Sequence, residues 1–248
     1  MNIVLTIEDM SEWNQWLHKF DNNQKDVYYT PEYYSLYQHN GDGLAKCFVY
    51  CEDEKIVLYP FLQNPITALG YDLDREYYDI QGAYGYNGII ATCKDAAFIA
   101  RFHECFDAFC QEQAIVAEFS RFHSILGNQV LASPNMKTFY SRHTVKLDLS
   151  PSLDDIWMKS FSSKNRNVIK KAQKEGVTIV ESKDYEFFRQ MYNQTMKNVE
   201  AEAFYFFPKS YYDEFQQNFG EDVILCFAMY DGKPISGSMF MFSQDYAH

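Results

Sequence analysis

The spacing of apolar residues along the first half predicts strands alternating with helices. Apolar side chains three and four residues apart indicate helices with one buried face, and short aromatic or β-branched runs indicate strands. Thr30 and Pro31 suit the cap and the first position of a helix. The predicted elements are a strand at 3–7, helices at 11–20 and from residue 31, a β-hairpin over 44–62, a helix over 95–113 and a strand over 115–120.

The second half repeats this order of elements. The pattern predicts a strand at 145–149, helices at 152–161, 162–176, 184–199 and 208–220, a strand at 177–182 and a hairpin over 222–242 that turns at Asp231–Gly232. Asp-Gly between two apolar runs is a strong hairpin signal. We therefore predict an α/β (α+β) fold with two related domains, at 1–144 and 145–248, each a mostly antiparallel sheet flanked by helices.

The repeat also shows a difference between the halves. Roughly 80 residues follow the first hairpin, whereas only Ser243–His248 follow the second. We therefore expect the second domain to be truncated, without its closing strands and helix.

Charge and cysteine usage narrow the function. The chain has 22 Lys+Arg against 34 Asp+Glu, a net charge of −12, which argues against non-specific binding to nucleic acid or anionic membrane. Six cysteines without CxxC or zinc-ligand spacing predict buried free thiols, no metal site and a reducing cytoplasm. The N-terminus has no basic region typical of a signal peptide, and no apolar run approaches the ~20 residues of a membrane span.

One segment reverses the overall charge. Residues 164–176 carry five cations and one acid, a charge of +4, which leaves −12 − 4 = −16 for the rest. Arg166, Lys170 and Lys174 form an i, i+4, i+8 ridge, with Lys164 and Lys171 beside it, while Val168, Ile169 and Ala172 point the other way as the expected inward face. A solvated helix face is one interpretation; a cationic face that recognises phosphate or pyrophosphate is the other. We expect the ridge to be exposed and to contribute little to folding.

Two further stretches offer candidate chemistry. The glycine-rich residues 77–89 contain Asp79, Tyr84 and Tyr86, which form either a kinked strand and turn or the lining of a cleft. There, Asp79 would serve as a base or orient an amine. Arg121 is either an anion clamp or a structural ion-pair partner. Strand alternation separates Ser120 from His123, so a hydrolytic triad is not expected.

Three stretches together resemble the Fem-type peptidyltransferases and related acyltransferases of the GNAT superfamily. They are FSSKNRNVIKKAQKEGVTI at 161–179, YYDIQGAYGYNGI at 77–89 and AEFSRFHSIL at 117–126. The resemblance implies tandem GNAT-like domains with an acceptor cleft between them, the first domain having lost cofactor binding. It implies transfer of an aminoacyl or acyl group to an amine. The donor would be aminoacyl-tRNA, acyl-CoA or an acyl carrier protein. The long two-helix arm of some Fem enzymes is missing here, which sets interpeptide-bridge synthesis in doubt.

The hypothesis that follows is a cytoplasmic GNAT-fold acyltransferase acting on an amine of a phosphorylated, carrier-linked cell-wall or capsular polysaccharide precursor. A non-catalytic module that binds an anionic ligand is the alternative, and a tRNA-binding face on the basic helix is a third interpretation. The candidate site residues are Asp79 as the catalytic group, and Lys164, Arg166, Lys170, Arg121, Tyr84 and Tyr86 as substrate-binding groups.

Overall fold

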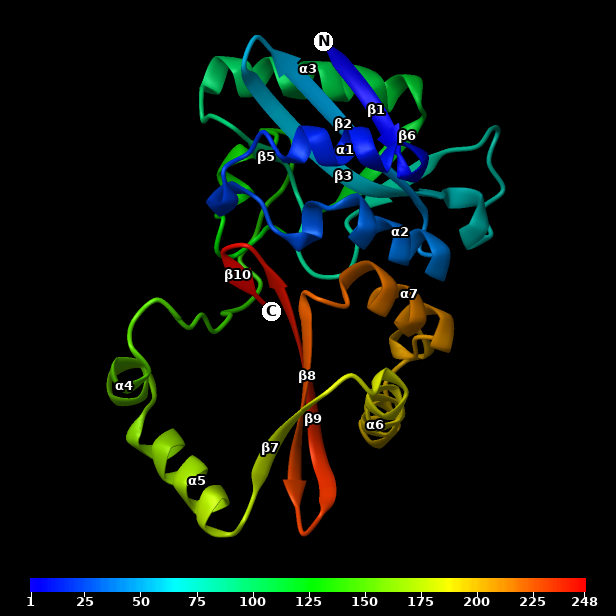
Figure 1. The fold of residues 1–248 in the computed structure, drawn as a ribbon. Coiled ribbons are helices and arrows are strands. Elements are labelled where there is room, and N and C mark those ends of the chain that lie inside the picture. Colours follow the sequence, from blue (N-terminus) through cyan, green and yellow to red (C-terminus); the bar gives the residue numbers. More distant parts are fainter. The chain divides into compact units, whose positions relative to one another are not determined.

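Two mostly antiparallel sheets and seven α-helices make up the fold, which confirms the predicted mixed α/β class. The computed structural model describes residues 1–248 (Figure 1). Its contacts divide the chain into two units. The first contains Met1–Phe139, Asp213–Gly220 and Phe242–His248, and the second contains Tyr140–Tyr212 and Glu221–Met241. That each unit is a GNAT-like domain stays a prediction.

The sheet of the first unit has the order β1-β2-β3-β4-β6, with β5 pairing β3. Only β4 and β6 run parallel, and a register shift between Tyr78 and Asp79 interrupts this pair. The strands are β1 (Asn2–Thr6), β2 (Leu44–Glu52), β3 (Lys55–Pro65), β4 (Tyr78–Gln81), β5 (Ile90–Ala91) and β6 (Ile115–Phe119).

Three α-helices lie entirely in the first unit, and one of them begins at the predicted cap. They are α1 (Met10–Leu17), α2 (Pro31–Asn40) and α3 (Ala96–Glu112). The Thr30 hydroxyl accepts a hydrogen bond from Tyr33 N, as predicted, and Asp95 caps α3 in the same way. One face of the sheet packs on α3 through aromatic rings, with Phe102 and Phe106 stacked at 5.8 Å between ring centroids.

The second unit contains three further helices, the start of a fourth and most of the second sheet. Its elements are α4 (Leu153–Asp155), which continues into a π-helical turn (Ile156–Ser160), α5 (Ser163–Lys174), β7 (Thr178–Ser182), α6 (Tyr185–Asn198), β8 (Val223–Tyr230), most of β9 (Lys233–Ser243) and the start of α7 (Lys209–Phe219). The β8–β9 turn has left-handed Asp231 (φ 49°) and Gly232 (φ 71°), which confirms the predicted hairpin. Strand β10 (Tyr246–Ala247) pairs with Phe242 and Ser243 of β9, and all of these residues belong to the first unit.

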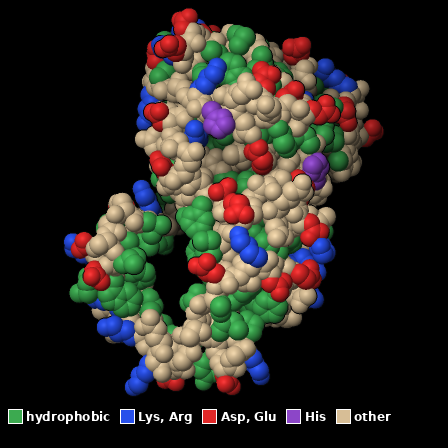
Figure 2. Space-filling view, in the orientation of Figure 1, with side chains coloured by type: hydrophobic (Ala, Val, Ile, Leu, Met, Phe, Trp, Pro, Cys, Tyr) green, Lys and Arg blue, Asp and Glu red, His purple; other side chains and the backbone are tan.

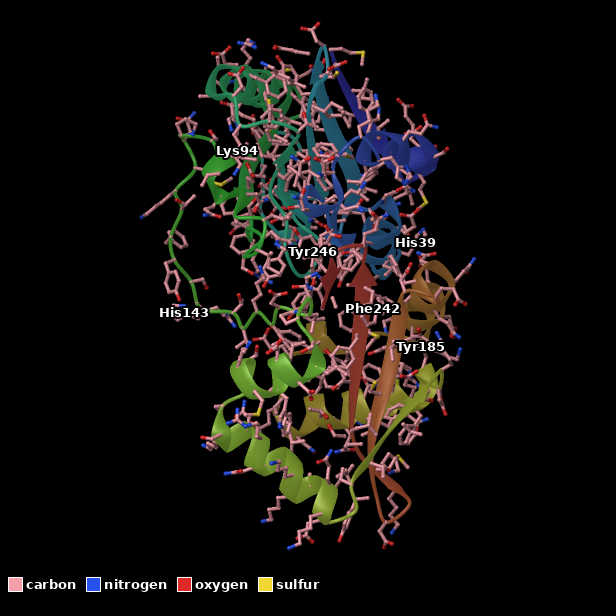
Figure 3. All side chains as sticks on the ribbon, turned by 60° about the vertical axis from the view of Figure 1, so that its left-hand side comes forward. His39, Lys94, His143, Tyr185, Phe242 and Tyr246 are labelled. Atoms are coloured by element: carbon pink, nitrogen blue, oxygen red, sulfur yellow. The ribbon has the colours of Figure 1, made fainter.

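Three predictions about local structure are wrong. Residues 145–149 form no strand: the apolar side chains that alternate there are exposed, Val145 fully, so the segment lacks the covered face that would stabilise one (Figure 3 shows nearby His143 on this extended segment). The expected inward face of α5 is not buried, since Val168 is 62% exposed and no residue of the helix is buried. Of the six free cysteines only Cys47 is buried. None of the helices has both the length and the apolar character needed to cross a membrane.

The aromatic core of the first unit gives a first test. Phe102 is fully buried among Phe48, Tyr50 and Phe106. Phe102→Ala should therefore lower the free energy of unfolding by about 3–5 kcal/mol, because it removes a large side chain and leaves a cavity. The matched control Phe139→Ala, at a ring that is 76% exposed, should change it by less than about 0.5 kcal/mol. Urea titration checks both, and equal effects would contradict this account of the core.

Candidate functional site

Two of the sequence motifs meet in the first unit. The glycine-rich loop that follows β4 lies beside the segment that follows β6, joined by an isolated parallel bridge between Asn87 and Phe122. Asn87 N donates to Arg121 O at 2.8 Å, and Arg121 N donates to Asn87 Oδ1 at 2.6 Å. The fold thus brings Tyr84, Tyr86 and Arg121 into one neighbourhood.

A buried asparagine holds these loops in place. Asn128 Nδ2 lies within donor distance of three oxygens, Asn87 O at 2.9 Å, Ile89 O at 3.1 Å and Tyr29 Oη at 3.0 Å, so one of its two hydrogens is shared between two of them. Its Oδ1 accepts from His123 N at 2.7 Å. One amide therefore fixes backbone from both motifs, as buried polar groups with satisfied partners do.

Gly85 allows the loop to approach the aromatic residues beneath it. Its φ of +116° is a conformation that side-chain-bearing residues rarely adopt, and an added Cβ would lie 2.3 Å from Tyr28 Cε1. The glycine therefore permits both the turn and the close contact that place Tyr84 and Tyr86 on either side of it.

A buried carboxylate lies below this loop. Asp26 is 3% exposed, and each of its oxygens accepts two hydrogen bonds. Oδ1 accepts from Val27 N and Ser243 Oγ, both at 2.7 Å. Oδ2 lies 2.8 Å from both His123 Nε2 and His248 Nε2. Burial alone would raise the pKa of this carboxyl, but the bonds from His123 and His248 outweigh it and hold the pKa well below its usual range.

The partners of His123 fix its tautomer. Its Nδ1 lies 3.1 Å from both Ile125 N and Leu126 N, which can only donate, so Nδ1 carries the lone pair and Nε2 the proton. The Nε2–H of His123 therefore points at Asp26.

This tautomer decides whether Asp26, His123 and His248 suit a metal ion. Their potential ligand atoms lie within 4.8 Å of one another. A metal on His123 Nε2 would require the proton to move to Nδ1, directly facing two N–H groups. The donor set therefore fits a hydrogen-bonded cluster and does not fit a cation.

Aromatic rings enclose the cluster. Tyr86 lies 4.6 Å from His123 and 5.4 Å from Tyr28 between ring centroids, and Tyr28 lies 4.8 Å from His248. Tyr246 closes another side, with its ring 5.9 Å from His123 and its hydroxyl donating to Asn23 O (Figure 3). Burial raises the pKa of Tyr28 far above the ordinary range, so its hydroxyl stays neutral.

The outer side of the loop carries an exposed cation. The Arg121 guanidinium is exposed and lies 5.7 Å from the centroid of the half-exposed Tyr84 ring. Its Nη1 makes only a long 3.5 Å bond to Gly85 O. No acid pairs with this cation, so the guanidinium can accept an anionic group.

Asp79 lies in a different place. It stands opposite Asn64 on β3 and Ala117 on β6, and it lines an open pocket of about 360 Å³ together with Glu118 and Phe119. Tyr84, Tyr86 and Arg121 do not line this pocket. The side chain of Glu118 is partly exposed, but its carboxyl end lies against Tyr59; desolvation there raises its pKa, while hydrogen bonds from Tyr59 and Ser120 act in the opposite direction.

In the second unit, α5 carries the cationic face that the sequence predicts. Ser162 Oγ accepts from Asn165 N at its start, and left-handed Gly176 follows its end. None of the salt bridges involves the four lysines or Arg166 of the segment. Figure 2 shows Lys and Arg side chains along the outer edge of the part formed by α4 and α5. Lys164 and Lys170 are exposed, and Lys170 Nζ lies 6.0 Å from the Trp157 ring centroid.

Arg166 departs from the expectation of a freely solvated ridge. It is half-buried, and its Nη1 donates to the carbonyl oxygens of Trp157 and Met158, both at 3.3 Å, and to that of Phe161. These carbonyls lie at the end of the π-helical turn, so Arg166 stabilises the corner between this turn and α5. None of these bonds uses Nε or Nη2, which stay available for an anion.

Sequence reasoning missed Asp26, Tyr28 and His248. The sequence pattern draws attention to His123 only as a possible partner of Ser120, and the two side chains make no hydrogen bond in the structure. Asp26 lies 97 residues from His123 and 222 from His248, so no local spacing reveals the cluster. The available signal was weak: one acid directly before the apolar and aromatic residues 27–29.

Comparison with known proteins identifies the family. The sequence model of the FemAB family matches residues 111–236, just over half of the 248 residues. The chain therefore belongs to the FemAB family. Members of this family are transferases, and the family's activity is aminoacyl transfer in peptidoglycan synthesis, in general with aminoacyl-tRNA as the donor. A search of curated proteins found no match.

The Asp26 cluster predicts how stability depends on pH. The folded-state pKa of Asp26 lies below the ordinary value of about 3.9, so the carboxylate stabilises the fold above about pH 4, and this contribution is lost as the pH falls further. Asp26→Asn should lower the free energy of unfolding at pH 7 by about 2–4 kcal/mol. It should also flatten the loss of stability between about pH 5 and 3.

Urea titrations across this pH range measure both effects. Asp72→Asn, at an exposed acid without a hydrogen-bond partner, is the control and should retain the wild-type pH dependence. A wild-type slope in Asp26→Asn would show that the carboxylate is not held as described.

The contacts of Arg166 predict a second effect on stability. Arg166→Gln should lower the free energy of unfolding by about 1–3 kcal/mol, because a charged donor to three carbonyls is lost. Lys171→Gln, at an exposed cation of the same helix, should change it by less than about 0.5 kcal/mol. Thermal unfolding followed by circular dichroism compares the two variants. Equal stability of the two variants would contradict a structural role for Arg166 and would make it a solvated residue of the ridge.

Proposed function

We propose that the protein transfers an aminoacyl group from charged tRNA to an amine of a phosphorylated, carrier-linked precursor of the cell wall. The observation that carries the proposal is the FemAB match over 111–236, which includes the basic helix and the Arg121 segment. A donor on charged tRNA would place the reaction in the cytoplasm. Acyl-CoA, or an acyl carrier protein, is the alternative donor.

The cations of α5 suit the phosphate groups of such an acceptor. Lys164 and Lys170 are exposed and unpaired, and Arg166 retains two guanidinium nitrogens for a further contact. The remainder of the chain has a charge of −16 by the sum given above, so a cationic patch without carboxylates is a local exception. Charge-assisted hydrogen bonds from such side chains are the common way in which proteins bind phosphate.

Considered by itself, the first unit also offers groups that could bind an acceptor. Arg121 beside Tyr84 can bind a carboxylate of a peptide or a second phosphate, and Tyr86 forms the wall behind them. Asp79, in its separate pocket, is our candidate for orienting an amine, since a carboxylate attracts an ammonium group. These roles follow from the chemistry of the side chains and their exposure.

A transfer assay tests the proposal. The donor is total tRNA charged with radiolabelled amino acids, and the acceptor is a lysine-containing, nucleotide-linked peptidoglycan precursor. The double variant Lys164→Gln and Lys170→Gln should weaken binding of the acceptor by about 2–4 kcal/mol. This corresponds to an increase in KM of roughly 30- to 900-fold, with kcat nearly unchanged. The salt dependence of KM should become flatter, because fewer charges are screened.

Two outcomes would count against the proposal. Lys94→Gln with Lys137→Gln, at lysines of the first unit, is the matched control and should keep the wild-type KM. If the α5 variant also keeps it, the basic face does not hold the acceptor. Binding of the precursor without transfer from charged tRNA or acyl-CoA would favour a non-catalytic module.

A further inference from the structure

His248 differs from His123 in the use of its second ring nitrogen. Its Nε2 lies 2.8 Å from Asp26 Oδ2, and because an ionised carboxylate only accepts, Nε2 carries a proton. Unlike His123 Nδ1, which accepts two backbone N–H groups, Nδ1 of His248 has no hydrogen-bond partner in the protein. The side chain is 16% exposed, so this nitrogen belongs to a ring that is held firmly and still reaches solvent.

The groups around His248 differ in whether their hydrogen-bonding atoms are already occupied. The titratable side chains facing it are Asp26, His123, Tyr28 and Tyr86. Asp26 stays ionised for the reasons given above, and Nδ1 of His123 already accepts two backbone N–H groups. The high pKa of Tyr28 keeps its hydroxyl protonated. Nδ1 of His248 is therefore the imidazole nitrogen of the cluster whose lone pair no protein group occupies.

A buried carboxylate holding one nitrogen of an imidazole, with the other nitrogen free, is the arrangement of a general base. The carboxylate fixes the ring orientation and the tautomer and stabilises the imidazolium once it forms. The second oxygen of Asp26 is occupied by Val27 N and Ser243 Oγ. Asp26 is thereby held in place, so the ring it orients has one defined position.

We propose that His248 is the general base of the transfer reaction and that Asp26 is its positioning residue; this rests on the proposed function. The acceptor nitrogen attacks as the neutral amine, after its ammonium form has released one proton to water, and its target is the ester carbonyl carbon of the aminoacyl group. The C–N bond forms, and the C–O bond to the tRNA ribose breaks. The nitrogen loses one proton to His248 Nδ1, and His248 returns this proton to the departing ribose oxygen. The reaction is balanced and needs no further reactant.

The location of the dyad is consistent with this role. Tyr28 and Tyr86 flank the His248 ring, and Tyr86 belongs to the same loop as Tyr84, beside which the exposed Arg121 lies. An acceptor whose anionic group binds Arg121 would contact the loop that covers His248. Asp79 lines the other pocket and is then not required as the base.

Kinetics of His248→Gln in the transfer assay test the proposal. General-base catalysis contributes about 10²–10⁴-fold, so kcat should fall at least about 100-fold while the KM of the precursor stays within a few-fold. The limb over which wild-type kcat rises with pH should disappear. Added imidazole should restore part of the rate, and a purely structural role would show no such rescue. His18→Gln, at an exposed histidine of the same unit, is the control and should behave as wild type.

A second measurement uses the unmodified protein and therefore tests the assignment even if His248→Gln does not fold. Nitrogen-detected NMR of the histidine rings should show His123 as the Nε2–H tautomer throughout the pH range and His248 gaining a proton at Nδ1 as the pH falls. A proton at Nδ1 of His123, or an unchanging His248, would overturn the assignment.

The outcomes separate this inference from the proposed function. If wild type transfers no aminoacyl group to the precursor, the proposed function fails. If wild type transfers and His248→Gln keeps its rate and pH limb, the base assignment alone fails. Loss of the limb in Asp79→Asn, with the limb retained in His248→Gln, would move the role to Asp79.

Discussion

The buried carboxylate of Asp26 is the constraint on which the candidate site depends. A charge at 3% exposure is costly to bury unless every lone pair is satisfied. The four donors come from Val27, His123, Ser243 and His248, which lie in three distant segments of the chain. Satisfying one carboxylate therefore fixes the start of α2, the loop after β6 and the end of β9 relative to one another.

The second constraint is the amide of Asn128, which connects the segment of His123, a partner of Asp26, to the loop at the surface. It bonds His123 on one side and the backbone of Asn87 and Ile89 on the other. The exposed loop that carries Tyr84 and the segment that carries Arg121 are thereby both fixed to the buried histidine. A binding group at the surface and a base beneath it can be held in register in this way, as preorganised sites require.

Elements governed by local chemistry could be predicted from the sequence. The cap at Thr30 and the Asp231–Gly232 turn depend on a few neighbouring residues, and the structure has both. The strand at 145–149 could not be judged, because alternation shows only that a face could be buried. The contacts of Asp26 were beyond reach as well, since they depend on how the whole unit folds. Arg166 was placed on the correct helix, but its carbonyl partners follow from a π-helical turn that the sequence does not reveal.

The hydrogen-bond partners of Asp26 also affect how the chain folds during synthesis. Its partners Ser243 and His248 lie 217 and 222 positions further along. Contacts of such separation form late, because a long loop must close before they are made. While residues 243–248 have not left the ribosome, the nascent first unit contains a carboxylate with two of its four donors missing. That intermediate either leaves Asp26 in water or takes up a proton, so this unit reaches its final packing only after β10 has been made and has docked.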